Sequence, residues 1–234
     1  MKFEHTEVWG FEHAIRGMRN PLESWKKSDS YLWRKNCSYC KEIANCSPSF
    51  HIGKNDLELM QRLIKAGSEH RKFLRQIFIS VDITAPLFWW KEFDTYKIGT
   101  VANSTSTMHK LASTPITKDC FEMGDFEHVT FTRDSAGIDI KLSTQNIWNG
   151  IISDLEALRR KYVETKDKRY WKELIRLLPE SWLQTRTITM NYENLLSMVH
   201  QRKNHKLTEW SIDFINWVKT LPYANELLFL EKGE

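Results

Sequence analysis

The sequence predicts a single domain of the α+β or α/β class. Its 234 residues fit one domain with one main core. Segments with helical periodicity outnumber strand-like segments, and helices separate the strands along the chain. Hydrophobic residues make up 41% and charged residues 27% of the sequence. This balance is typical of a globular chain that can bury a core without a disulfide or a metal.

The apolar spacing along the chain places the expected elements. Apolar residues three and four apart predict helices, and alternation predicts strands. The expected helices are one that begins at Pro86 and those over 56–66, 147–162, 168–178, 191–203 and 208–220. The expected strands lie over 76–84, 128–133, 137–142 and 185–190. Residues 7–53 and 112–127 carry turn signals without a period, so we expect them to be irregular.

The clearest strand is the one over 76–84, in which aliphatic residues alternate with a more polar set. The aliphatic positions are Ile77, Ile79, Val81 and Ile83. Because successive side chains of a strand point to opposite faces, this alternation predicts one buried face.

The charge and hydropathy patterns argue against a nucleic-acid-binding protein, a membrane protein and a secreted protein. The net charge of +4 is mild, and no charged block has the length of a tail, so we do not expect nucleic acid as a partner. No apolar run approaches the roughly 18 residues of a membrane span, so we expect no membrane partner. The first residues lack the apolar core of a signal peptide, which predicts a cytoplasmic protein.

Three cysteines and a histidine lie close together near the N-terminus. They are Cys37, Cys40, Cys46 and His51. A Cys3His set can bind zinc, but this spacing matches no common zinc module. We therefore treat them as weak metal candidates in a Cys-rich loop, with reduced cysteines as the alternative.

The stretch after the strand over 76–84 gives the strongest signal for a site. It begins with a helix whose Trp89 and Trp90 we expect to pack in the core or an interface. The following segment offers a lysine and many short hydroxyl and amide groups, which suit a nucleotide phosphate. The nucleotide-binding candidates there are Lys97, Thr100, Asn103, Ser104, Thr105 and Ser106. The alternative is an ordinary surface loop with Ser/Thr turns.

The order of these features resembles the flavin-dependent thymidylate synthases. In that family a helix leads to a strand, then Ala-Pro-hydrophobic, a helix with Arg-Gln-Trp, and the motif R-H-R-x7-S. The corresponding stretches here are Ala85–Phe88, Lys91–Phe93, Thr95–Lys97 and Thr105, without a gap. A second block follows the family's L-P, N-x-R-S-L and downstream Arg. Its matches are Leu178-Pro179, Asn191, Arg202, His205 and Trp210–Ile212.

The resemblance implies a fold, a site and an oligomer. It implies an α+β domain with a central, mostly antiparallel sheet flanked by helices, and a core that spans 54–234 after an irregular region over 1–53. It assigns Arg202 to the base as the catalytic residue and Arg176 to the nucleotide. It assigns Tyr96, Lys97, Asn191 and His205 to the cofactor. It further implies FAD as the cofactor, folate and NADPH as co-substrates, and a homotetramer.

The sequence departs from the family where the flavin is held. Thr95-Tyr96-Lys97 replaces R-H-R, so one cation of two is kept. Thr105 keeps a hydroxyl at the family's Ser position, whereas Glu193 reverses the charge of the Arg in N-x-R. The nucleotide half of the motif set is thus better kept than the flavin half.

Three hypotheses follow. The first is a divergent thymidylate-synthase-like methyltransferase that uses flavin and folate on dUMP or a related pyrimidine nucleotide. The second is a nucleotide sensor or sequestering protein on the same scaffold, without turnover. The third, which we rank lower, is a zinc-bearing partner of nucleic acid.

Overall fold

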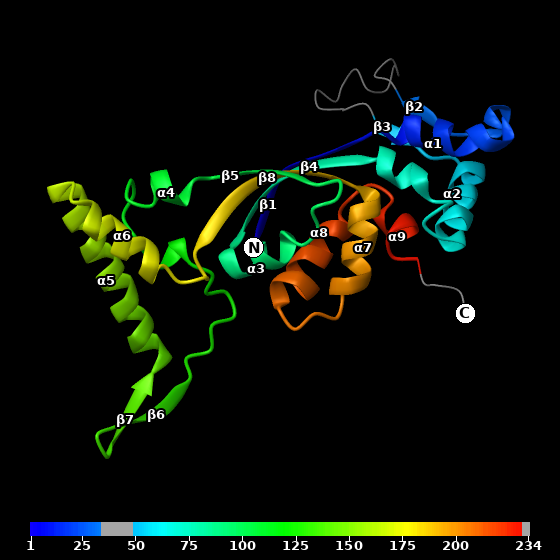
Figure 1. Ribbon diagram of the computed structural model, residues 1–234. Helices are drawn as coiled ribbons and strands as arrows, with labels where there is room; N and C mark the ends of the chain where they lie inside the picture. Colours follow the sequence, from blue (N-terminus) through cyan, green and yellow to red (C-terminus); the bar gives the residue numbers. More distant parts are fainter. Residues whose placement is uncertain (34–48, 231–234) are drawn as a thin grey trace, which may run out of the picture. The chain divides into compact units, whose positions relative to one another are not determined.

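The computed structural model describes residues 1–33 and 49–230 (Figure 1). Cys37, Cys40 and Cys46 lie outside the described residues. Within the described ranges, no group of three His, Cys, Asp or Glu side chains could hold a metal ion. No helix in this part of the chain has the length and apolar character needed to cross a membrane.

Helices and short strands alternate along the chain. The strands are β1 (Lys2–Trp9), β2 (Tyr31–Trp33), β3 (Ser49–His51), β4 (Phe78–Pro86), β5 (Val101–Ser104), β6 (Thr130–Ser135), β7 (Ile138–Ser143) and β8 (Leu183–Asn191). The α-helices are α1 (Phe11–Arg19), α2 (Lys54–Ala66), α3 (Leu87–Phe93), α4 (Thr107–Lys110), α5 (Thr144–Thr165), α6 (Lys168–Leu177), α7 (Tyr192–Arg202), α8 (Ile215–Lys219) and α9 (Ala224–Leu227). A π-helix, η6 (Glu209–Phe214), precedes α8, and short 3-10 turns include η4 (Lys72–Gln76).

The chain folds into two compact units. The first unit comprises Met1–Lys2, Ile83–Thr95 and Asn103–Arg186. The second unit comprises Phe3–Asp82, Tyr96–Ala102 and Thr187–Glu234. The expected domain, 1–234, stays a prediction, and each unit is described by itself below.

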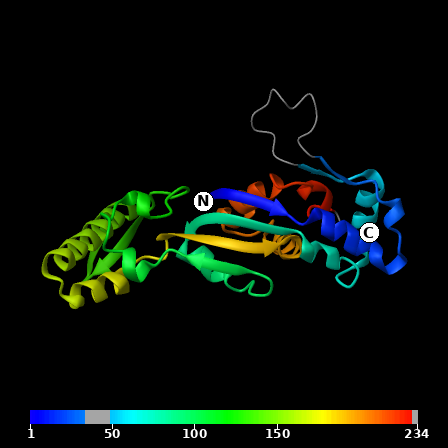
Figure 2. The same cartoon turned by 90° about the horizontal axis from the view of Figure 1, so that it is seen from above.

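The main sheet has the strand order β1-β4-β8-β5. Side-chain hydrogen bonds join three pairs of residues on one face of β4 and β8, namely Ser80–Thr189 at 3.4 Å, Asp82–Thr187 at 2.6 Å and Thr84–Thr185 at 2.7 Å. Positions advance by two along β4 while they retreat by two along β8, as in an antiparallel pair. The predicted antiparallel sheet flanked by helices is confirmed (Figures 1 and 2).

The opposite face of β4 is apolar and buried. The aliphatic residues predicted for this face, from Ile77 to Ile83, are between 0 and 1% exposed. Trp89 and Trp90, which follow on α3, are also buried, so their expected packing role is confirmed. Trp90 Nε1 donates a hydrogen bond to the backbone oxygen of Gln184 at 2.9 Å.

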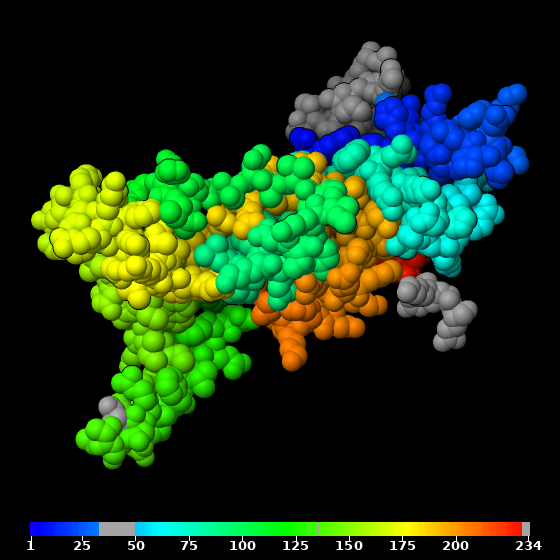
Figure 3. All heavy atoms as spheres, in the orientation of Figure 1, coloured from blue at the N-terminus to red at the C-terminus, as the bar shows by residue number. Residues whose placement is uncertain are grey.

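A second apolar cluster lies in the first unit. Its buried residues are Leu111, Ile116, Phe121, Leu155 and Leu174. They fill the space beside α5 and α6, which lie side by side (Figures 1 and 3).

Glu156 on α5 anchors an irregular segment to this cluster. Its carboxylate accepts hydrogen bonds from Arg159 Nε at 2.7 Å and from the backbone N–H of Ile116 at 2.8 Å. The hydrogen bond from Arg159, supported by that backbone bond and by Arg160, lowers the pKa of Glu156 to about 2, although burial acts in the opposite direction.

The strands predicted around Gly137 form a two-stranded hairpin. Phe131 pairs with Leu142 and Arg133 with Ile140. At its tip Ala136 and Gly137 have φ values of 56° and 80°. Two consecutive residues with positive φ are what a two-residue type I′ turn requires, which explains the glycine.

The expected irregular region over 7–53 is wrong in part, because it contains α1, β2 and β3 and the end of β1. In β1, His5 has a φ of 52°, so the alternation of the partly buried positions breaks between Phe3 and Val8. In α1 the charged Arg19 occupies a buried position, so the apolar period is incomplete. By contrast, 112–127 is irregular as predicted, apart from one 3-10 turn over Lys118–Cys120.

The hydroxyl-rich segment is only partly the expected loop. Val101–Ser104 forms the edge strand β5, and Thr107–Lys110 forms the single turn α4. All four residues of β5 are exposed, so no alternation of apolar and polar residues marks the strand in the sequence.

Candidate functional site

Arg202 ends a helix whose start is firmly capped. The Asn191 side chain accepts a hydrogen bond from the backbone N–H of Asn194, and the Asn194 side chain accepts one from the N–H of Asn191. This reciprocal cap satisfies two donors at the start of α7. Leu195 and Val199 then bury one face of the helix, and Arg202 lies in its last turn, where the helix dipole favours a cation.

Aromatic side chains hold the Arg202 guanidinium. Arg202 Nε donates a hydrogen bond to the Tyr96 hydroxyl at 2.8 Å, and that hydroxyl donates to Gln201 Oε1 at 2.9 Å. The guanidinium carbon lies 4.9 Å from the centroid of the Trp210 ring and 5.5 Å from that of Tyr96. A guanidinium stacked on rings loses little entropy when its in-plane N–H groups bind a planar ligand, so this arrangement is preorganised.

The turn that carries Tyr96 and Lys97 is fixed against the start of α7. Asn194 Nδ2 donates a hydrogen bond to the backbone oxygen of Ile98 at 2.7 Å, and Thr100 Oγ1 donates to that of Tyr96. Gly99 has a φ of 77°, and a Cβ added to it would lie 3.1 Å from both Asn191 Nδ2 and Asn194 Oδ1. The turn therefore requires glycine, both for its φ and for the close approach.

The segment after Arg202 includes the π-helix. The N–H of His205 donates to the Arg202 backbone oxygen at 3.0 Å, and His205 Nδ1 accepts from the Leu207 N–H at 3.2 Å. Trp210 then lies buried in η6 beside Arg202. Single turns of π-helix occur frequently at functional sites, so the local geometry agrees with a site here.

The charge reversal at Glu193 is balanced within the second unit. Arg71 Nε donates to both carboxylate oxygens of Glu193, at 3.1 and 3.0 Å. The two side chains are 23% and 18% exposed, so this is a half-buried ion pair rather than a surface contact.

A different cluster organises the hydroxyl-rich segment in the first unit, and the sequence alone did not indicate it. Arg186 donates to Asp94 Oδ1 at 2.7 Å and to Gln184 Oε1 at 3.0 Å, and its guanidinium carbon lies 4.3 Å from the Trp90 ring centroid. Gln184 Nε2 in turn donates to the Thr105 backbone oxygen at 2.9 Å. These hydrogen bonds fix the backbone at Thr105, one of the residues expected to contact a phosphate.

The predicted site residues fall into two groups. The second unit brings together the turn and the helix that carry Tyr96, Lys97, Thr100, Asn191, Arg202 and His205. The first unit contains Asn103, Ser104, Thr105, Ser106 and Arg176. Ser106 caps α4 by accepting from the His109 N–H, and Arg176 forms an exposed ion pair with Glu173 at 2.6 Å. The ligand contacts assigned to both groups stay predictions.

The second unit also contains a large basic cavity of about 840 Å³, bounded by α1, α2 and η4. Its lining includes Lys26, Lys27, Arg62, His70 and Lys72. The size is within the range of cofactor sites, and the excess of cations favours an anionic occupant.

No protein-family model and no curated protein matches the sequence. Solved structures do match over nearly the whole length. One is the flavin-dependent thymidylate synthase ThyX of Helicobacter pylori complexed with FAD and dUMP, with a TM-score of 0.65 and 16% identity over 98% of each chain. A second structure of ThyX from this organism with FAD and dUMP has a TM-score of 0.64 and 17% identity over 98% of this chain and 97% of that one. The fold is therefore that of ThyX, as the resemblance implied.

Proposed function

We propose that the protein binds a pyrimidine nucleotide and acts as a flavin-dependent thymidylate-synthase-like methyltransferase on dUMP or a related nucleotide. The observation that carries the proposal is Arg202, held by Tyr96 and Trp210 at the end of a firmly capped helix. The ThyX fold supports it, because the matching structures contain FAD and dUMP.

Arg202 has the role of polarising the pyrimidine in this proposal. A guanidinium can donate two parallel hydrogen bonds to a ring carbonyl and the adjacent ring nitrogen. These bonds strengthen as negative charge develops on the ring, so they favour the transition state over the ground state. The phosphate contacts that the resemblance assigns to Arg176, Thr105 and Ser106, in the first unit, stay predictions.

The residues present fit a dinucleotide cofactor through charge rather than through the family motif. Reduced FAD, when bound, would supply the hydride equivalent, with folate and NADPH as co-substrates. Lys97 is exposed on its fixed turn, and we assign a cofactor phosphate to it. The basic cavity lined by Lys26, Lys27 and Arg62 is a separate place in the same unit that suits an anion. Asn191 and His205 already serve backbone groups, so their flavin contacts rest on the resemblance alone.

One observation favours the alternative of a nucleotide binder without turnover. Tyr96 occupies the His position of R-H-R, and its hydroxyl is engaged by Arg202 and Gln201. A phenol in that network holds the guanidinium but does not offer the two ring nitrogens of the imidazole that the family motif has at this position.

By the same resemblance we propose a cytoplasmic homotetramer. Sedimentation of the purified protein measures the assembly directly: a mass of four chains supports it, and a monomer contradicts it.

The visible spectrum of the purified protein tests the cofactor, first alone, then with FAD, then with FAD and dUMP. A perturbed flavin band supports the enzyme. If flavin does not bind under any of these conditions but titration calorimetry detects dUMP binding, the non-catalytic binder replaces the enzyme. If neither ligand binds, both hypotheses are wrong.

Replacement of Arg202 tests the nucleotide site. We expect Arg202→Gln to weaken dUMP binding by at least about tenfold, because a bidentate charged contact is worth roughly 1.5–3 kcal/mol. Titration calorimetry measures the affinity. Arg169→Gln is the matched control, since Arg169 is exposed and pairs only locally with Asp167. Equal dUMP affinities for the two variants would remove Arg202 from the site.

A further inference from the structure

A smaller cavity lies outside the two sequence blocks that carry the motif resemblance to the synthases. It has a volume of about 450 Å³, and all its lining residues lie between Glu12 and Phe50, in the second unit. The resemblance covers 55–111 and 172–221, so the residues assigned to nucleotide and flavin do not line this space. Its volume suits a small molecule of one or two rings.

Arg19, Ser28 and Ser30, which line the cavity, belong to a network of hydrogen bonds around Asp56. Asp56 is fully buried and accepts hydrogen bonds from Arg19 Nε at 2.6 Å, Ser28 Oγ at 2.6 Å and Ser30 Oγ at 2.7 Å. Arg19 also donates to the backbone oxygens of Ser24 and Lys27. Its charge is therefore matched by Asp56, and the network is preformed and electrically neutral.

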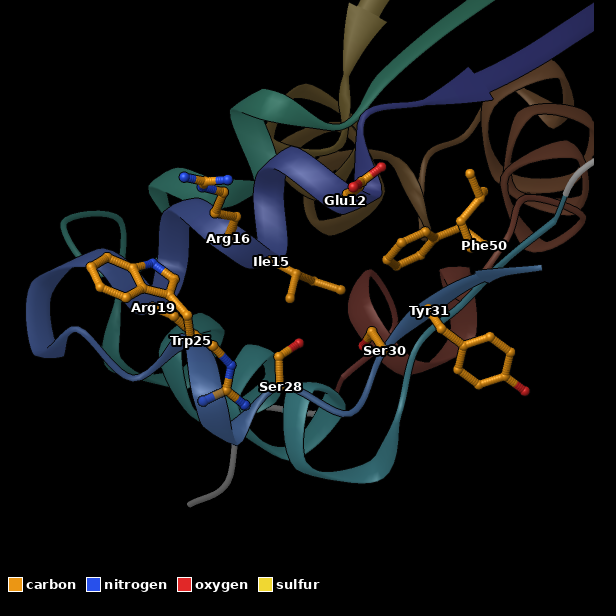
Figure 4. A pocket seen from close by; sticks show the side chains of 10 residues that line it. Glu12, Ile15, Arg16, Arg19, Trp25, Ser28, Ser30, Tyr31 and Phe50 are labelled. Carbon is orange, nitrogen blue, oxygen red and sulfur yellow. The ribbon is translucent and has the colours of Figure 1, made fainter. Parts of the chain in front are cut away.

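Apolar and aromatic side chains form the walls. Figure 4 shows Ile15 and Phe50 pointing toward each other across the space, with Trp25 and Tyr31 at its two ends. Trp25 is 45% and Tyr31 54% exposed, so ring surface is available to a ligand. Burial of a ring against such walls is favoured by its apolar area and by ring–ring contacts.

The rim carries one charge of each sign. Glu12 and Arg16 are four residues apart on α1, the spacing at which such side chains normally pair. Among the described residues, neither side chain has an ion pair or a side-chain hydrogen bond. Both residues line the cavity from α1, and Figure 4 shows Arg16 on the Trp25 side of the view and Glu12 on the Phe50 side.

We propose that this cavity binds an aromatic zwitterion of the aromatic amino acid class. The ring would lie between Ile15 and Phe50, the carboxylate would bind Arg16, and the ammonium would bind Glu12. A ligand with no net charge suits a lining with no net charge, because it leaves neither rim group uncompensated. The Cβ atoms of residues four apart lie roughly 5–6 Å from each other, so both long side chains can reach adjacent groups of one ligand.

A ligand series separates the ring from each charge. The probes are L-tryptophan, tryptamine with only the ammonium, indole-3-propionate with only the carboxylate, and N-acetyl-L-tryptophanamide with neither. We expect L-tryptophan to bind most tightly in titration calorimetry, and the blocked amide to bind at least about a hundredfold more weakly, about tenfold for each lost charge contact. Absence of L-tryptophan binding, or equal binding of the blocked amide, overturns the proposal.

Variants of the two rim residues assign each contact. Arg16→Gln should weaken the binding of L-tryptophan and of indole-3-propionate about tenfold and leave tryptamine binding unchanged. Glu12→Gln should weaken the binding of L-tryptophan and of tryptamine about tenfold and leave indole-3-propionate binding unchanged. The charge-exchanged double variant Glu12→Arg/Arg16→Glu should recover part of the L-tryptophan affinity. Arg75→Gln, an exposed arginine that does not line the cavity, is the matched control.

The outcome is separable from that of the proposed function. Both rim residues are exposed, so we expect the variants to keep the unfolding temperature of the wild type. A loss of affinity that is the same for all four ligands would show a nonspecific effect and contradict the proposal. Because no residue of this cavity is assigned to dUMP or FAD, failure of either proposal leaves the other standing.

Discussion

At the scale of single residues, one carboxylate of the first unit connects several groups. Glu156 joins two arginines to the backbone of Ile116, and its pKa is about 2. A lowered carboxyl pKa stabilises the folded state above the unfolded pKa near 4.3–4.5, and this stabilisation is lost as the pH falls toward 2.

Replacement of Glu156 should therefore lower the free energy of unfolding by an amount that depends on pH. We expect Glu156→Gln to lower the free energy of unfolding by about 2–3 kcal/mol at pH 7, and by progressively less below pH 4.5. Urea denaturation at pH 7 and at pH 3 measures both values.

Glu164→Gln is the control for this substitution. Glu164 lies on the same helix and pairs only with Lys161, with both side chains more than half exposed. A surface pair contributes about 0–1 kcal/mol, so its replacement should have little effect at either pH. An equal loss of unfolding free energy for both variants would show that Glu156 contributes no more than a surface ion pair.

At the scale of elements, the turn between Tyr96 and Thr100 positions the Tyr96 and Lys97 side chains of the candidate site. Gly99 has a positive φ and lies against the side chains that cap α7. We expect Gly99→Ala to destabilise the protein by about 1–2 kcal/mol through its φ and the close contact. It should also weaken dUMP binding, because the turn carries Tyr96 and Lys97. Thermal unfolding and calorimetry measure the two effects.

Gly137→Ala separates the two causes. Gly137 has a similar φ of 80°, but a Cβ there would meet nothing within 4 Å. The Gly137→Ala variant should lose about 1 kcal/mol of free energy of unfolding and keep the dUMP affinity of the wild type. A Gly99 variant that behaves like the Gly137 variant would show that the turn does not position the site.

Elements with a complete apolar period could be predicted from the sequence, and the others could not. β4 and the helix over 56–66 have full periods, so their existence was evident and only their ends differ. β5 is exposed throughout, and α1 buries a charged residue, so neither has the pattern that predicts it.

The residues of the candidate site also divide into those that the sequence could predict and those that it could not. Arg202 and Tyr96 follow from family resemblance at matching positions. The relay from Asp94 through Arg186 to Gln184 joins residues 92 positions apart in sequence, and no local pattern reveals such a contact.

At the scale of the whole molecule, both units contain a hydrogen-bonded carboxylate with a lowered pKa, Glu156 in the first unit and Asp56 in the second. In the second unit, burial would raise the pKa of Asp56, but hydrogen bonds from Ser28, Ser30 and Arg19 outweigh it. Asp56 and Glu156 both stabilise the protein above their unfolded pKa values, so stability should fall together in both units as the solution is acidified.

The two carboxylates share no hydrogen-bond partner, so their effects should add. Asp56→Asn should cost about 3–5 kcal/mol, because it leaves Arg19 buried without its counter-charge. The double variant Asp56→Asn/Glu156→Gln should lose the sum of the single losses within about 0.5 kcal/mol. Urea denaturation at pH 7 measures all three variants, and a deviation above about 1 kcal/mol would show that the networks are coupled.

The hydrogen-bonded ladder between β4 and β8 has a consequence for how this scaffold can vary. Its three rungs join residues 101 to 109 positions apart. Doubling the length of such a long connection costs only about 0.6 kcal/mol of closure entropy. Meanwhile, a slip of one residue would turn Ser80 and Asp82 toward the apolar core. The intervening chain can therefore gain, lose or replace whole segments while the strands that frame them keep their alignment. New chemistry can thus arise on this fold without a new fold.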